Sequence, residues 1–169
     1  RDVDFLQGLS KRRAMELELI SSIGKSNDYH KGWHQRKIDA VFGSRRGVRV
    51  VVWGLTYKPG TNTLRRSSSV ELCRWLHHQG FLVRVHDPAF QSLPEELEGI
   101  AEFLADPIEA CSGCEVLIIM TAWPRYLQIS SEDVVAVMKG ATVIDASRFL
   151  ANTLGKSSRL TYVTMGKQP

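Results

Sequence analysis

The stretch from Val48 to Ser69 constrains the fold of this chain more than any other part of the sequence. It opens with a nearly continuous run of valines, which is typical of a strand buried on both faces of a parallel sheet. Gly54 ends that strand. Ser68 and Glu71 have the spacing of a capping box, which predicts a helix that begins there and stops at Gly80. The stretch therefore predicts a strand, a loop and a helix N-terminus in succession.

The loop between this strand and this helix is basic, with Lys58, Arg65 and Arg66. In an open α/β sheet, ligands bind beyond the carboxyl ends of the strands, where a helix N-terminus offers free N–H groups and a partial positive charge. The glycine-rich GxGxxG sequence is absent, so the three basic side chains would have to supply the charge for a phosphate. A solvated basic loop without a ligand is the alternative interpretation.

Further along the chain, predicted strands and helices alternate. The strands are expected at 48–53, 82–86, 115–120, 141–145 and near 162–165, and the helices at 68–79, 107–112 and, with an early break, 123–139. An irregular acidic segment is expected at 91–105. Such alternation predicts a parallel sheet of five or six strands with helices on both faces. The predicted fold class is α/β, with a three-layer Rossmann-like domain over 48–169.

Residues 1–42 differ in character from this domain, and a short linker at 43–47 separates the two. This segment is rich in charged residues, and its leucines and isoleucines recur at roughly helical spacing, which predicts two or three helices. Gly24 and the polar cluster at 26–28 interrupt the pattern, so a second helical piece is expected from Tyr29 to Phe42. Helices without a sheet of their own need a partner, and a second copy of the chain is one candidate.

Composition narrows the function classes. The 169 residues carry a net charge of only +4, and the basic residues are scattered, which favours a small anionic ligand over nucleic acid. No apolar run approaches the ~20 residues that a membrane helix needs. The three cysteines and the lack of a signal peptide indicate a reduced, cytoplasmic setting.

Two sequence patterns suggest a metal or redox site, but their contexts favour a structural role. Cys111 and Cys114 form a CxxC pair without the second pair that a zinc site requires, and they lie at a helix end, where the dipole disfavours a thiolate. His30 and His34 have the spacing of HExxH, but Lys31 stands where the glutamate is needed. No metal is expected.

Two acidic residues follow predicted strands at the same edge of the sheet. Asp87 ends the second strand, where a dinucleotide fold places the acid that holds a ribose hydroxyl, but the missing glycine fingerprint favours a structural role over a ribose contact. Asp145 ends the last clear strand and could cap its loop. Asp106, followed by Pro107, has the pattern of a helix N-cap.

Four blocks of sequence carry a resemblance to a known family. They are GLTYKPGTNTLRRSS, VRVHDPAF (Val83–Phe90), VLIIMTAWPRY (Val116–Tyr126) and VIDASRFL (Val143–Leu150). In this order they resemble the C-terminal nucleotide-sugar-binding domain of the UDP-glucose/GDP-mannose dehydrogenase family. The resemblance covers most of residues 48–150.

The resemblance implies an NAD-dependent oxidation of the C6 hydroxyl of UDP-glucose, or of a related UDP- or GDP-sugar, to a uronic acid for polysaccharide biosynthesis. In the family this reaction passes through a thiohemiacetal on a cysteine. That cysteine and the NAD-binding domain belong to the N-terminal half, so this chain alone is expected to be inactive. The alternative is a non-catalytic α/β regulatory domain that senses a nucleotide. A nucleic-acid-binding module is a third, weaker alternative, because no basic strand face lined by aromatic residues is evident.

The same resemblance implies roles for individual residues. Lys58 and the main chain near Tyr57 would face the nucleotide sugar, and Arg65 would face the phosphates of NAD. Asp2 would be a catalytic carboxylate beside the missing nucleophile. Residues 1–42 would be part of the central helical segment through which family members form dimers, which implies a homodimer.

The chain departs from the family pattern at several positions of these loops. Thr63 and Arg66 stand where the family usually has Asp and Glu, so the first loop has lost two acids and gained a base. Ser147 stands where an arginine is expected, and the neighbouring Arg148 is the candidate replacement as a substrate-binding residue. These differences leave the base and the sugar of the substrate open.

Overall fold

The computed structural model describes residues 2–13 and 17–166. The chain divides into two compact units, with the boundary between Val41 and Phe42.

The N-terminal unit is helical, as the sequence predicts. It contains α1 (Asp2–Arg12), α2 (Glu18–Lys31) and all but the last residue of α3 (Trp33–Phe42). The expected interruption was wrong, because α2 continues through Gly24, which is buried, and through the polar residues 26–28, which are exposed. The helix ends instead at Lys31, with Gly32 as its C-cap, so the next helix begins at Trp33 rather than at Tyr29.

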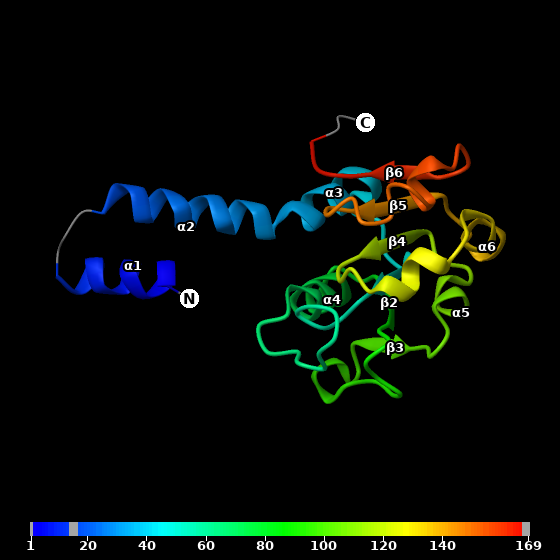
Figure 1. Ribbon diagram of the computed structural model, residues 1–169, viewed down its shortest axis with the longest axis horizontal. Coiled ribbons are helices and arrows are strands. Elements are labelled where there is room, and N and C mark those ends of the chain that lie inside the picture. Colours follow the sequence, from blue (N-terminus) through cyan, green and yellow to red (C-terminus); the bar gives the residue numbers. More distant parts are fainter. Residues whose placement is uncertain (1, 14–16, 167–169) are drawn as a thin grey trace. The chain divides into compact units, whose positions relative to one another are not determined.

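The C-terminal unit is built on a six-stranded sheet in which every pair of neighbours is parallel, and this confirms the predicted fold class (Figure 1). The strands are β1 (Arg49–Trp53), β2 (Leu82–His86), β3 (Ala101–Phe103), β4 (Val116–Ile119), β5 (Thr142–Asp145) and β6 (Thr161–Val163). Their order across the sheet is β3-β2-β1-β4-β5-β6. β3 lies within the segment 91–105 that the sequence predicted to be irregular.

Helices cover both faces of this sheet. α4 (Ser68–His78) packs beside the short 3-10 helix η1 (Glu95–Leu97), whereas α5 (Pro107–Cys111) packs beside α6 (Ser131–Val137). The two pairs lie on opposite faces because the chain steps toward one edge from β1 to β3 and toward the other from β4 to β6, and parallel crossovers are right-handed. The expected helix 123–139 is divided between η2 (Pro124–Gln128) and α6.

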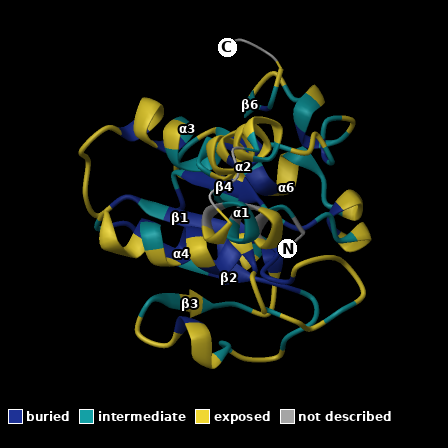
Figure 2. Cartoon of the chain, turned by 90° about the vertical axis from the view of Figure 1, so that its left-hand side faces the viewer, coloured by how far each residue is buried: buried dark blue, intermediate teal, exposed yellow. Residues whose placement is uncertain are grey.

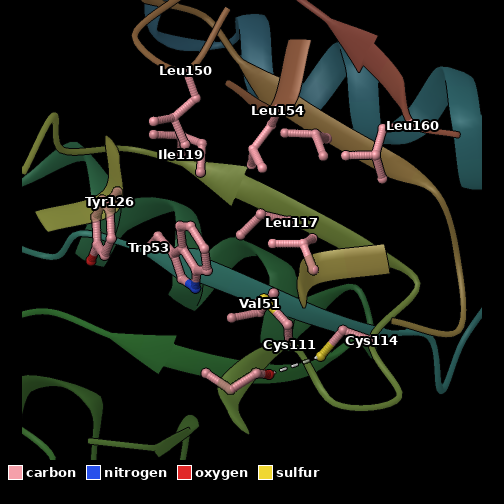
Figure 3. Close-up of a cluster of buried hydrophobic side chains, with 13 residues drawn as sticks. Val51, Trp53, Cys111, Cys114, Leu117, Ile119, Tyr126, Leu150, Leu154 and Leu160 are labelled. Carbon is pink, nitrogen blue, oxygen red and sulfur yellow. Dashed lines mark hydrogen bonds between the residues drawn. The ribbon is translucent and has the colours of Figure 1, made fainter. Parts of the chain in front are cut away.

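A cluster of buried side chains fills the space between the sheet and the helices α5 and α6 (Figure 3). Trp53 on β1 stacks on Tyr126 with ring centroids 4.7 Å apart, and its indole Nε1 donates to the carbonyl of Pro107 at 3.2 Å. Cys111 and Cys114 are free thiols in this cluster. Burial raises the pKa of the Cys114 thiol to about 11 and that of Cys111 well above its ordinary value. Their environment fits the structural interpretation of the CxxC pair.

Burial is concentrated in the central strands, while the surrounding helices keep exposed faces (Figure 2). Val50 to Trp53 and Val116 to Ile118 are completely buried, as expected of strands covered on both faces. The continuous apolar runs in the sequence therefore correspond to the two central strands of the sheet.

The helix termini show one correct and one wrong prediction. Asp106 caps α5, and its Oδ1 accepts hydrogen bonds from the amides of Ile108 and Glu109, both at 2.8 Å. In α4 the cap is Ser67 rather than Ser68, because the Ser67 hydroxyl accepts from the amides of Ser69 and Val70. The run of three serines made the capping-box spacing ambiguous by one residue.

Candidate functional site

The strand order places the topological switch point between β1 and β4, where ligands bind in folds of this class. From β1 the chain turns toward β2, and from β4 it turns toward β5, so the loops after these two strands diverge. The loops after β2 and β5 flank them. A functional site is therefore expected at the carboxyl edge of these four strands.

At the switch point itself the two backbones are in close contact. Gly54, with φ of 94°, lies so near the start of the β4 loop that a Cβ there would be 2.4 Å from Cβ of Thr121. The Thr121 hydroxyl donates to the carbonyl of Thr56 at 2.6 Å. Only glycine fits both the backbone angle and the contact. The side chains that remain available to a ligand are consequently those further out along the loops.

Asp87 holds the beginning, or root, of the loop that joins β1 to α4 (residues 54–67), which we call the β1 loop. Its carboxylate is fully buried and accepts hydrogen bonds from the amides of Leu55 at 2.6 Å, Thr56 at 3.0 Å and Ala89 at 2.8 Å. The Thr56 hydroxyl and the indole Nε1 of Trp123 add two more donors, at 3.2 Å and 3.1 Å. Four of these five donors share Oδ2 and one bonds to Oδ1, and the full burial of the carboxylate leaves it no solvent-facing side. The structure makes Asp87 a loop-holding residue rather than a ribose ligand.

Asp145 caps the loop after β5, which is one of the roles that its position in the sequence allows. This carboxylate is also fully buried, and it accepts from the amide of Leu150 at 2.8 Å and the hydroxyl of Ser147 at 2.8 Å. The phenol of Tyr162 on β6 donates to it at 2.5 Å. Burial, followed by the carboxylate itself, raises the pKa of Tyr162 well above its ordinary value.

Beyond its buried root, the β1 loop projects into solvent with Tyr57 and Lys58 at its tip. Tyr57 is 68% exposed, and the loop is closed by a bond from its amide to the carbonyl of Thr63 at 3.2 Å. The Thr61 hydroxyl donates to the carbonyl of Lys58 at 3.2 Å. Within the described part of the chain, neither the Tyr57 phenol nor the Lys58 ammonium has a partner. Both side chains are therefore available to a ligand.

The far end of the same loop borders a pocket of about 500 Å³, which we call the arginine pocket. Its charged lining residues are Arg65, Arg66, Glu71, Arg74 and Glu96. Arg74 is held by a bond from Nη2 to the carbonyl of Glu96 at 3.2 Å. Among the described residues, the guanidinium groups of Arg65 and Arg66 form no ion pair. The pocket thus combines an excess of positive charge with free hydrogen-bond donors.

Arg66 and Arg148 are the only non-glycine residues in the described part of the chain with a positive φ, at 60° and 61°. Such conformations occur mainly where the surrounding structure enforces them, often at ligand-binding loops. Arg148 is exposed on the β5 loop, and its amide donates to the carbonyl of Asp145 at 3.2 Å.

The sequence-predicted site residues do not all lie on one segment. Tyr57, Lys58 and Arg65 share the β1 loop, whereas Arg148 lies on the loop after β5, at the same edge of the sheet but two strands away. Asp2 begins α1 in the other unit, and its side chain lies outside the described residues. The structure therefore places four of the five candidates at one edge of one sheet.

Sequence reasoning missed a buried pair behind the Asp87 network. The Tyr126 hydroxyl donates to the carbonyl of His86 at 3.2 Å and lies 3.0 Å from Nδ1 of its ring. Burial, followed by the charge of Arg125, lowers the pKa of His86 to about 4. Its position directly before Asp87 was the only sequence signal, and it is a weak one.

Within the described residues, the structure has neither a side-chain cluster suited to a metal ion nor a helix suited to spanning a membrane. No group of three or more His, Cys, Asp or Glu side chains is arranged to hold a metal ion there. In the same part of the chain, no helix has the length and hydropathy that crossing a bilayer requires.

Comparison with known proteins decides the family. The model of the UDP-glucose/GDP-mannose dehydrogenase family, UDP binding domain, matches residues 51–152. The chain belongs to this family. The matched range contains the whole β1 loop, the arginine pocket and the loops that Asp87 and Asp145 hold.

Individual relatives agree with this assignment. The UDP-glucose 6-dehydrogenase of Rickettsia prowazekii is 25% identical over 171 residues, which cover 99% of this chain and 39% of that protein. Among solved structures, a UDP-glucose dehydrogenase from Pyrobaculum islandicum is 26% identical with a TM-score of 0.72, over 98% of this chain and 35% of that one. GDP-mannose dehydrogenase of Pseudomonas aeruginosa shares the fold, with a TM-score of 0.71 at 21% identity over 96% of this chain and 37% of that one. This chain therefore spans well under half the length of these relatives.

Proposed function

We propose that this family member is part of an NAD-dependent nucleotide-sugar 6-dehydrogenase and that it supplies the nucleotide-sugar-binding side of the active site. The observation that carries the proposal is the match to the UDP binding domain over a range whose β1 loop presents an exposed lysine beyond the carboxyl ends of the strands, and among the described residues this lysine has no partner. Relatives named as UDP-glucose 6-dehydrogenases suggest oxidation of UDP-glucose, or of a related sugar nucleotide, to the uronic acid.

In this proposal the β1 loop binds the nucleotide diphosphate. The Lys58 ammonium supplies a charge-assisted hydrogen bond to a phosphate oxygen, which is stronger than a bond between neutral groups. The Tyr57 amide is already bonded to Thr63, so its carbonyl and its ring are the groups that remain for the sugar nucleotide. Arg148 is the candidate second cation from the β5 loop.

The arginine pocket suits the phosphates of NAD. Arg65 is the proposed contact, because its guanidinium is exposed, lacks an ion-pair partner among the described residues and has the forked geometry that phosphates favour. Bound NAD would accept the hydride from the sugar. The described residues contain no glycine fingerprint, so the rest of the cofactor would be held by other parts of the longer protein. Asp2 remains the proposed catalytic carboxylate.

Titration calorimetry on this chain tests the division of labour between Lys58 and Arg65. UDP, UDP-glucose, GDP-mannose and NAD would be titrated into the wild type, Lys58→Ala and Arg65→Ala, with the exposed Arg159→Ala as a charge-matched control. Losing a charge-assisted contact costs roughly 1.5–3 kcal/mol, so Lys58→Ala should weaken UDP-sugar binding about ten- to a hundredfold. Arg65→Ala and Arg159→Ala should leave it nearly unchanged.

Equal losses of UDP-sugar affinity from Lys58→Ala and Arg65→Ala would refute the proposed roles. The absence of any nucleotide binding at millimolar concentration would remove the support for a site in this chain. Because the proposal assigns the nucleophile to another part of the protein, this chain is expected to turn over none of the sugars by itself. The cost of Arg65→Ala should emerge in the longer enzyme as weaker use of NAD.

We also propose that the helical unit mediates a homodimer. Its helices leave large apolar side chains in solvent, with Phe5 62%, Leu19 73% and Tyr29 67% exposed. Apolar surface of this kind favours burial against another molecule. Sedimentation velocity at several concentrations should show a dimer that Leu19→Lys weakens, while a concentration-independent monomer would contradict the proposal.

The reduced cytoplasm is the proposed setting of the protein. All three cysteines are buried free thiols, and burial raises the pKa of each. Unpaired cysteines are common where the cell keeps thiols reduced.

A further inference from the structure

The two loops that diverge at the switch point both donate hydrogen bonds to one oxygen atom. Oδ2 of Asp87 accepts from the amide of Leu55 at 2.6 Å and the amide of Thr56 at 3.0 Å, both on the β1 loop. The same oxygen accepts from the indole Nε1 of Trp123, on the β4 loop, at 3.1 Å. Asp87 follows β2, so three segments distant in sequence share a single acceptor.

This shared acceptor lies at the root of the loop that carries Lys58. The N–H groups of Leu55 and Thr56 point to Asp87, while their carbonyls accept from the hydroxyls of Ser67 at 2.5 Å and Thr121 at 2.6 Å. Both residues are therefore held on the donor and the acceptor side of the backbone. Because the loop beyond Thr56 is exposed, this root sets where Lys58 lies relative to the sheet.

We propose that Trp123, acting through Asp87, is a positioning residue for Lys58. The indole N–H fixes the orientation of the carboxylate, and the carboxylate fixes Leu55 and Thr56, which lie three and two residues before the lysine. Without the indole donor the carboxylate rotates more freely, and the root of the loop shifts with it. A misplacement of about 1 Å is enough to weaken a directional contact to a ligand. The proposal rests on the proposed function, because its main readout is nucleotide binding at Lys58.

Two substitutions remove single donors from this oxygen while the buried carboxylate stays in place. Trp123→Phe deletes the indole N–H of a partly exposed ring, and Thr56→Val deletes the hydroxyl that donates to Oδ2 at 3.2 Å. Tyr126→Phe is the matched control, because it also deletes one donor from the β4–α6 connection. That donor bonds to His86 and does not contact Asp87.

Thermal unfolding and UDP calorimetry would be measured on the three variants. We expect Trp123→Phe and Thr56→Val each to weaken UDP binding roughly three- to tenfold, the range that corresponds to one ordinary hydrogen bond. The double variant should lose less than the product of the two single losses, since both act through the same carboxylate. Tyr126→Phe should lower the unfolding midpoint about as much as Trp123→Phe or Thr56→Val does. It should change UDP affinity less than twofold.

The outcomes separate this inference from the proposed function. If UDP affinity falls equally in Tyr126→Phe, the effect follows stability and the positioning role is wrong. If Lys58→Ala weakens UDP binding but Trp123→Phe does not, the positioning role is again wrong while the proposed site stands. If the wild type binds no UDP, the proposed function fails, and amide NMR shifts decide the inference alone. Trp123→Phe should then move the Lys58 amide resonance more than Tyr126→Phe does, and an unmoved resonance would overturn the proposal.

Discussion

Asp87 directly follows β2 and Asp145 is the last residue of β5, so both lie at the carboxyl edge of the sheet, and both are fully buried. Their donors differ in origin. Asp87 joins the loops after β1 and β4 to its own, whereas Asp145 bonds mainly within its own loop and takes one further donor from Tyr162 on the neighbouring strand. The same residue at the same kind of position thus makes a long-range connection in one case and a local cap in the other. What surrounds a carboxylate decides its role more than the strand that it follows.

The largest test of this comparison removes each carboxylate. Asp87→Ala would leave the amides of Leu55 and Thr56 without acceptors, and both are buried. At roughly 1–3 kcal/mol for each unsatisfied buried group, this variant should lose about 4 kcal/mol of unfolding free energy. Asp145→Ala leaves one fully buried amide, that of Leu150, without its acceptor. The hydroxyls of Ser147 and Tyr162 also lose their acceptor, but they belong to more exposed side chains, so this variant should lose about half as much. Urea denaturation measures both, and equal losses would show that the two connections are energetically alike.

The second test uses pH, because a titratable residue precedes only Asp87. The pKa of His86 is lowered from 6.5 to about 4 in the folded chain, chiefly by burial. Above pH 6.5 the ring is neutral in both states, and as the pH falls from there to about 4 only the unfolded chain gains the proton. Stability should therefore be lost across that window, by on the order of 3 kcal/mol.

Urea denaturation of the wild type and His86→Phe at pH 7 and pH 4.5 isolates this effect. The variant cannot gain a proton at this position, so its stability should fall less over the same interval. Equal losses of stability in the wild type and the variant would show that groups other than His86, at the end of β2, cause the acid sensitivity.

The smallest expected effect concerns the one donor that Asp145 receives from another strand. Tyr162→Phe removes the phenolic hydroxyl but keeps the ring, and Asp145 retains the Leu150 amide and the Ser147 hydroxyl. A single hydrogen bond contributes about 1 kcal/mol, so the denaturation midpoint should fall only slightly. A loss as large as that of Asp145→Ala would show that the connection to β6, rather than the local cap, carries the stability.

Sequence patterns predicted the parts of this fold that depend on local chemistry or on continuous burial. The valine run predicted β1, and Asp106 before Pro107 predicted the start of α5. Each of these signals lies in neighbouring residues. The resemblance to a family then supplied the ligand class and the candidate residues Lys58 and Arg65, which composition and spacing alone left undecided.

The wrong predictions concern features that depend on contacts between residues far apart in the sequence. β3 consists of only three residues in an acidic segment, and its pairing with β2, rather than its own pattern, makes it a strand. Ser67 replaces Ser68 as the cap because its hydroxyl also donates to the carbonyl of Leu55, twelve residues earlier. The role of Asp87 depends on Trp123, which is 36 residues away. No window of sequence contains such pairs.

Both outer strands of the sheet are very short, and this limits how sheets of neighbouring molecules can join. β3 and β6 have three residues each, so each edge offers few unpaired backbone groups to an approaching strand. Glu102 on β3 adds a charge that Arg84 pairs at 2.8 Å. Strand-by-strand extension into a continuous intermolecular sheet is therefore disfavoured at both ends. A concentrated solution of this chain should resist fibrillar aggregation for as long as its native sheet remains intact.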